Sequence, residues 1–167
     1  MLEKLSGGDR RSIGRADEVV AEVLADLALF DEVFAGVFSD DPLIRMRAAD
    51  VCEKVSAAHP ECLTPHKQDL LGRVAAIAQQ EVRWHVAQML PRLDLDGEER
   101  ALAVQILEGY LQDRSKIVKT FAMQALADLA LADGRFYARV RGLLEDLVET
   151  GSPAMRSRGG KLLARLA

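Results

Sequence analysis

The sequence predicts an all-α protein built from stacked pairs of helices. A short phrase, in which an apolar residue is followed by Arg or Lys, returns four times along the chain. Its leading apolar residues lie 38, 36 and 37 positions apart, a period typical of helical-repeat arrays. Aromatic residues are only 5% of the chain, and Ala and Leu dominate, which favours close packing of helices over sheets. The four copies of the phrase occupy residues 44–49, 82–87, 118–123 and 155–160.

Length, charge and hydropathy narrow the class of protein further. The 167 residues can bury one sizeable core, and no apolar run reaches the roughly 18 residues of a membrane span. Residues 1–15 are polar and lack the apolar stretch of a signal peptide, so we expect a flexible segment there and a cytoplasmic protein. A net charge of −4 argues against a dedicated nucleic-acid binder. The remaining residues, 16–167, are expected to form a single domain.

The first half of the chain predicts a short helix followed by two helix pairs. Asp41-Pro42 and Thr64-Pro65 each place a capping side chain before a proline, which marks a helix start. Pro91 should end or kink the helix that contains it. The expected helices lie near 16–25, then 27–39 with 42–57, and 65–79 with 80–93.

The second half predicts two more pairs by the same signals. Asp96 with Glu99 forms a capping-box pattern, Ser115 is a candidate cap, and Ser152-Pro153 marks the last helix start. Turns of only a few residues within pairs require antiparallel neighbours. The expected helices lie near 97–112 with 115–131, and 135–149 with 152–166, so the four repeats span about 27–57, 65–93, 97–131 and 135–166.

These features together resemble HEAT repeats, the antiparallel helix pairs of many scaffold proteins. The resemblance rests on the runs at 44–49, 82–90 and 118–126 and covers roughly residues 27–166. It implies a right-handed α-solenoid of about four helix pairs plus a short N-terminal helix, similar to small bacterial HEAT-repeat proteins without a settled activity. In the family, a turn Asp and the Arg of the second helix commonly form a ladder. Here Asp113 precedes Lys119 at the family's offset, whereas no matching Asp precedes Arg83 or Arg156.

The charges of the predicted helices separate by their place in the pair. The second helices carry a net charge of +7 and the first helices −3. In a right-handed stack the second helices would line a concave side, so a basic inner surface could attract an acidic partner. The alternative is a set of ion pairs between repeats, with ordinary solvated helix faces. The residues that we expect to hold the partner are Arg45, Arg47, Arg83, Trp84, Lys119, Arg156 and Arg158.

Trp84, the only tryptophan, is the residue of this set most typical of a binding interface. A helical wheel places it on the exposed side, near a Met46 that is also expected to be exposed. A tryptophan beside Arg and Met has the composition of an interface hot spot. The alternative is that helix tilt turns Trp84 into the groove between repeats. Phe121 and His85, at boundary positions, are expected to pack.

Other site classes find little support in the sequence. His59, Cys62 and His66 are zinc-ligand types, but their spacing is not that of a structural zinc site, so we predict no metal and no cofactor. Phosphate-binding and hydrolase motifs are absent, so we predict no enzyme. Two alternatives remain: a nucleic-acid-binding or DNA-glycosylase-like repeat protein with Asp50 as its acid, and oligomerisation through Leu162, Leu163 and Leu166.

Overall fold

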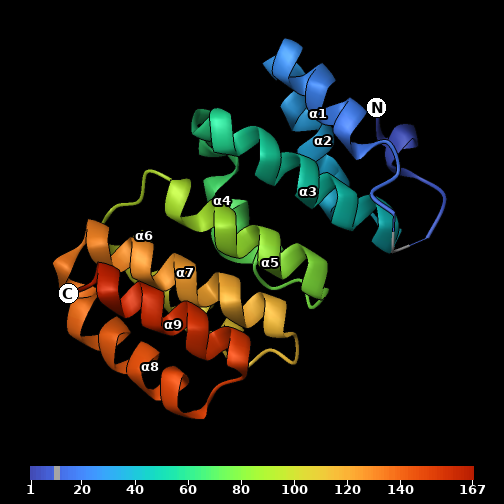
Figure 1. Ribbon diagram of the computed structural model, residues 1–167. Helices are drawn as coiled ribbons and strands as arrows, with labels where there is room; N and C mark the ends of the chain where they lie inside the picture. Colours follow the sequence, from blue (N-terminus) through green and yellow to red (C-terminus); the bar gives the residue numbers. More distant parts are fainter. Residues whose placement is uncertain (10–11) are drawn as a thin grey trace. The chain divides into compact units, whose positions relative to one another are not determined.

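The computed structural model describes residues 1–9 and 12–167, and its regular elements are all helical (Figure 1). No strand occurs in these ranges, which confirms the predicted all-α class. The chain divides into two compact units, Met1–Asp94 and Leu95–Ala167. We describe each unit by itself, and the expectation of a single domain over 16–167 stays a prediction.

The first unit is organised around α3 (Pro42–Ala58), which contacts α1, α2 and α5. Figure 1 shows α3 lying between α1 and α5. The second helices of the first two repeats, α3 and α5, therefore pack against each other, as stacked pairs require. The first unit also contains further α-helices, several 3₁₀ turns and the π-helical η5. In chain order, these elements are η1 (Leu2–Leu5), α1 (Ala16–Ala25), η2 (Leu27–Leu29), α2 (Phe30–Ala35), η3 (Gly36–Phe38), η4 (Pro60–His66), α4 (Lys67–Asp69), η5 (Leu70–Val74), α5 (Gln80–Met89) and η6 (Leu90–Arg92).

The start of α3 follows the predicted signal. Asp41 Oδ1 accepts a hydrogen bond from the Leu43 amide at 2.8 Å, and Pro42 occupies the first helical position. The helix buries an apolar stripe that includes Val51 and Val55, both fully buried. Capping and burial thus fix the one long helix of this unit.

The continuous helix expected over 65–79 is wrong. Residues 60–74 instead form a 3₁₀ turn, one turn of α4 and a π-helical turn. Pro65 lies inside the 3₁₀ segment rather than at a helix start, and Thr64 provides no cap. Because Pro65 has no backbone N–H to donate, it interrupts the α-helical hydrogen-bond pattern inside the segment that contains it.

The described part of residues 1–15 is packed onto the rest of the first unit. Leu5 is fully buried, and the Met1 amino group lies 3.1 Å from Glu32 Oε1. Lys4 Nζ lies 2.9 Å from Glu18 Oε1 and also pairs with Glu22. We expected a flexible segment here. Residues 10–11 of that range lie outside the described residues, and the parts on either side of them contact α1, α2 and α3.

The second unit has the same plan around α7 (Lys116–Ala132), which contacts α6, α8 and α9. The predicted caps are confirmed, since Asp96 and Glu99 form a capping box and both Ser115 and Ser152 accept from their helix backbones. Helices α7 and α9 are the second members of consecutive pairs, and they pack against each other. The other elements are α6 (Gly97–Tyr110), η7 (Gly134–Phe136), α8 (Tyr137–Thr150) and α9 (Pro153–Arg165).

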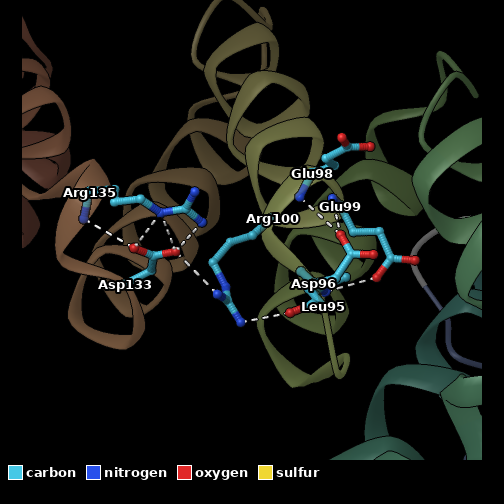
Figure 2. Close-up of polar contacts among 7 residues, drawn as sticks. All are labelled: Leu95, Asp96, Glu98, Glu99, Arg100, Asp133 and Arg135. Atoms are coloured by element: carbon cyan, nitrogen blue, oxygen red, sulfur yellow. Dashed lines mark hydrogen bonds and ion pairs between the residues drawn. The ribbon is translucent and has the colours of Figure 1, made fainter.

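A polar cluster ties the start of α6 to the turn between α7 and α8 (Figure 2). Arg100 donates to the Leu95 carbonyl at 2.8 Å and to Asp133 Oδ2 at 3.2 Å. Asp133 also accepts from Arg135 at 2.6 Å. The hydrogen bonds from Arg135, followed by those from its own backbone amide and Arg100, hold the pKa of Asp133 far below its usual range. The carboxylate therefore stays charged as a link between the third and fourth repeats.

Ion pairs one repeat apart recur inside each unit. In the first unit, Lys54 pairs with Asp17 at 2.9 Å, 37 positions away. In the second unit, Arg165 pairs with Asp128 at 3.0 Å, also 37 positions away, and Arg139 pairs with Glu108 at 2.6 Å. The alternative of ion pairs between repeats is therefore confirmed for part of the second-helix charge.

Candidate partner-binding site

The arginine of the repeated phrase closes the turn that precedes its helix. Arg45 Nη1 donates to the Ser39 carbonyl at 2.9 Å, and Arg83 Nε donates to the Ile77 carbonyl at 3.0 Å. Arg156 Nε donates to the carbonyl of Gly151 at 2.9 Å. Three of the four phrase cations thus satisfy backbone acceptors near the start of a second helix, a structural role that the sequence analysis did not foresee.

Arg47 is a correction to the predicted partner-binding set. Its side chain is 1% exposed, so no partner can reach it. Its guanidinium donates six hydrogen bonds to backbone carbonyls of the N-terminal segment, at 2.7 to 3.3 Å. A planar guanidinium with five N–H groups suits a ring of carbonyls. The accepting residues are Leu5, Ser6, Gly7, Asp9 and Ser12.

Lys119 differs from the other three phrase cations. In its repeat the turn is closed by Asp113, whose Oδ1 accepts from the Ser115 amide at 2.8 Å. Within the described residues, the Lys119 ammonium has no hydrogen bond or ion pair. It lines a cavity of about 280 Å³ together with Arg114 and Lys116, whose charged groups are likewise unpaired in the described part of the chain. We call this cavity the basic cavity.

The basic cavity lies where α7 and α9 begin. Ser152, the N-cap of α9, also lines the cavity, and none of its eight described lining residues is acidic. A helix N-terminus carries a partial positive charge, which adds to that of the three cations. The potential in this cavity therefore favours an anion. The lining residues are Arg114, Lys116, Lys119, Leu147, Thr150, Gly151, Ser152 and Met155.

Arg156 and Arg158, from the predicted set, are exposed on α9. Arg158 Nη1 donates to Gln124 Oε1 at 3.0 Å, which holds it against α7. Lys161, farther along α9, is exposed and unpaired in the described structure. The second unit therefore keeps accessible cations on α7 and α9, whereas Arg45, Arg47 and Arg83 of the first unit bind its own backbone.

Trp84 is half-buried and lines a separate cavity of about 240 Å³ within the first unit. Its Nε1 donates to His85 Nε2 at 2.9 Å. Met46 lines the same cavity, as expected from the wheel, but it is only 8% exposed, so its expected exposure is wrong. The wheel treats α3 alone and cannot show other parts of the unit that cover it. The lining residues are Ser12, Ile13, Met46, Arg47, Asp50, Glu81, Trp84 and His85.

His85 is buried as expected, with Nδ1 unpaired in the described structure. Burial lowers the pKa of His85, against the opposing effect of Asp50, whose Oδ1 lies 3.8 Å from Nε2. The imidazole is therefore neutral near pH 7, which lets Nε2 accept from Trp84.

The histidines that were considered as zinc ligands contact neighbouring side chains instead. His66 pairs with Asp31 at 2.8 Å and stacks on Phe34, while His59 pairs with Glu61. The described residues contain no cluster of three His, Cys, Asp or Glu side chains that could hold a metal ion.

The C-terminal leucines and the length of the helices bear on two further predictions. Leu162 and Leu166, considered for oligomerisation, are buried. No described helix has both the length and the apolar character needed to cross a bilayer.

The sequence analysis missed Arg114 and Lys116 as site residues. The signal in the sequence is that the third copy of the phrase has Lys where the other copies have Arg, and that Arg114 and Lys116 come shortly before it. Lysine cannot form the bidentate fork of arginine, so its ammonium is less suited to closing a turn. A copy of the phrase that differs from the other copies thus indicates a position at which the cation does not close the turn.

Antiparallel helix pairs, whose second members pack on one another and are joined by contacts one repeat apart, define a helical-repeat protein. The model of the HEAT repeat domain family matches residues 2–150, and the chain belongs to this family. The match includes the N-terminal segment held by Arg47. Searches of curated proteins and of solved structures found no match. HEAT repeats generally serve as protein-interaction scaffolds and are typically not enzymes.

Proposed function

We propose that the protein is a non-enzymatic interaction module whose second unit binds an acidic segment of a partner protein. The observation that carries the proposal is the basic cavity, which Arg114, Lys116 and Lys119 line with no acid among its described lining residues. Unpaired cations in a concave site gain more from an incoming carboxylate than cations already in ion pairs. Arg156 and Arg158 on α9 extend the positive surface for further carboxylates.

The proposed binding surface covers only the second unit, whereas the sequence predicted a basic surface along all four repeats. Arg45 and Arg83 remain as half-buried cations of the first unit, but their hydrogen bonds to turn carbonyls reduce their availability. We therefore assign recognition of the acidic segment to the second unit alone.

The test is binding of a fluorescein-labelled peptide rich in Asp and Glu, followed by anisotropy at two salt concentrations. The double variant Lys116→Glu/Lys119→Glu should weaken binding at least tenfold, which corresponds to about 1.4 kcal/mol. The matched control is Arg139→Glu/Arg141→Glu, which changes the net charge equally but alters cations of α8 that pair with Glu108 and Glu145.

Equal loss of binding in both double variants would show a general effect of net charge and would refute a dedicated site. A 20-base-pair DNA duplex serves as the competing probe. Tighter binding of the duplex than of the peptide at 150 mM salt would instead support the nucleic-acid alternative.

A further inference from the structure

The cavity beside Trp84 has a character opposite to that of the basic cavity. Two of its lining residues, Asp50 and Glu81, are acidic, and Arg47 is the one permanently charged cation among its described lining residues. Arg47 is 1% exposed, and its N–H groups donate to backbone carbonyls, so it offers no free donor to an incoming group. Among the described lining residues, the charged groups that an incoming side chain can contact are therefore the carboxylates.

The two carboxylates are not equally available. Asp50 Oδ2 lies 2.9 Å from Lys54 Nζ, so its charge is largely compensated. Glu81 is half-buried, and its Oε1 accepts a hydrogen bond from the neutral amide of Gln80 at 3.4 Å. Glu81 thus has no cationic partner in the described part of the chain, although it lies at the edge of a cavity.

Trp84 is held in place for contact with a ligand. Its indole N–H donates to His85 Nε2 at 2.9 Å, and His85 is itself about nine-tenths buried. A half-exposed indole fixed by a buried partner loses little side-chain entropy on binding. Ile13, at 46% exposure, and Met46 add apolar surface to the same cavity.

These observations describe a site with an apolar lining, an oriented indole and an uncompensated carboxylate. A lysine or arginine side chain fits each of them, because its methylene stem packs on apolar groups while its cation contacts a ring face and a carboxylate. The volume of about 240 Å³ exceeds the roughly 150 Å³ of an apolar cavity that holds benzene, so one long side chain can enter.

We propose that the Trp84 cavity binds a lysine or arginine side chain of a partner protein, with Trp84 contacting its stem and cation and Glu81 pairing with its charge. This site is independent of the basic cavity in the second unit and takes a segment of opposite charge. It also changes the interpretation of Trp84: Arg47 lines the same cavity but is buried, so the charged groups accessible beside the indole are carboxylates.

The test uses Trp84 itself as the reporter, because it is the only tryptophan in the chain. The probe is a short glycine-flanked lysine peptide, and the matched ligand is the same peptide with acetyl-lysine, which keeps the stem but removes the charge. We expect a saturable change in tryptophan emission with the lysine peptide and at least a fivefold weaker response with the acetylated one.

Two charge-neutralising variants locate the cation. Glu81→Gln should weaken binding of the lysine peptide about three- to tenfold, whereas Glu61→Gln, which removes an exposed carboxylate outside the cavity, should leave it unchanged. Trp84→Leu should abolish binding, measured by anisotropy of a labelled peptide, while the far-UV CD spectrum stays that of the wild type. Loss of folding in Trp84→Leu would leave the Glu81→Gln comparison to decide.

The proposal is overturned if both peptides bind equally, since the cavity would then select apolar stems without regard to charge. It is also overturned if Glu61→Gln and Glu81→Gln weaken binding to the same extent, or if the lysine peptide leaves the emission unchanged at millimolar concentration. An Asp- and Glu-rich peptide that changes Trp84 emission would reverse the assigned charge. The Lys116→Glu/Lys119→Glu variant should leave lysine-peptide binding intact, so failure of one site is distinguishable from failure of the other.

Discussion

Replacing Arg47 with methionine should destabilise the first unit more than any other single change of a cation there. Methionine keeps much of the apolar stem and removes the six hydrogen bonds that the guanidinium donates to backbone carbonyls. Leaving a buried acceptor without its donor costs about 1–3 kcal/mol. The carbonyls of Ser6, Gly7 and Asp9 belong to exposed residues and can be rehydrated, which reduces the cost. Exposure of Leu5 adds about 1.5–3 kcal/mol if the segment detaches. We expect a net loss of about 3–4 kcal/mol.

Urea unfolding followed by Trp84 fluorescence measures this loss, because the only tryptophan lies in the first unit. Arg45→Met is the matched control on the same helix. Arg45 is half-buried and donates two recorded hydrogen bonds, to Ser39 and Gln79, so its loss should cost about 1–2 kcal/mol.

Amide hydrogen exchange then identifies what Arg47 holds. In Arg47→Met the amides of residues 2–6 should lose protection, whereas in Arg45→Met they should keep it. Equal destabilisation by the two variants, with unchanged exchange at residues 2–6, would refute the role assigned to Arg47.

Two further predictions concern packing and pH. Gly160→Ala should stabilise the second unit by about 0.5–1 kcal/mol, since a Cβ there meets no atom within 4 Å, whereas Gly159→Ala should destabilise it because its Cβ would lie 2.6 Å from Val148 Cγ2. Urea unfolding followed by far-UV CD compares the pair, and a stabilising Gly159→Ala would contradict the packing. Because burial lowers the pKa of His85 in the folded state, the unfolded chain binds the extra proton, so stability should fall as the pH drops below about 6.5. His85→Gln should reduce that slope in urea midpoints measured from pH 7.5 to 5.5, and an unchanged slope would exclude His85 as its source.

Local signals in the sequence predicted most helix bounds, and these signals are physical. Asp41-Pro42, the Asp96–Glu99 capping box and Ser152-Pro153 mark helix starts in the structure because each satisfies backbone donors that a helix leaves open. Thr64-Pro65 carries the same signature and does not begin a helix. Pro60 lies nearby, and the chain forms a 3₁₀ turn that passes through both prolines.

The site was predicted less well, because a helical wheel describes one helix and not what covers it. Arg47 and Met46 are buried, and the carbonyls that bind Arg47 belong to an N-terminal segment without periodicity, about 40 positions away. Arg45 and Arg83 contact turns six residues before them, a relation that residue type alone does not reveal. Lys119 stays a predicted partner-binding cation, and residue type alone does not reveal that Asp113 binds the turn amide in its repeat.

The cation of the repeated phrase has different contacts in different repeats, and this difference bears on how the sequences of such repeat proteins can change. Where arginine binds a turn carbonyl, its replacement by lysine would free a charge at some cost in local order. At position 119 the turn has its own closure, so the residue there can vary in charge or size with little structural penalty. Repeats whose turn is closed by a residue other than the cation of the phrase are therefore the places where a scaffold of this kind can acquire a new specificity without losing its fold.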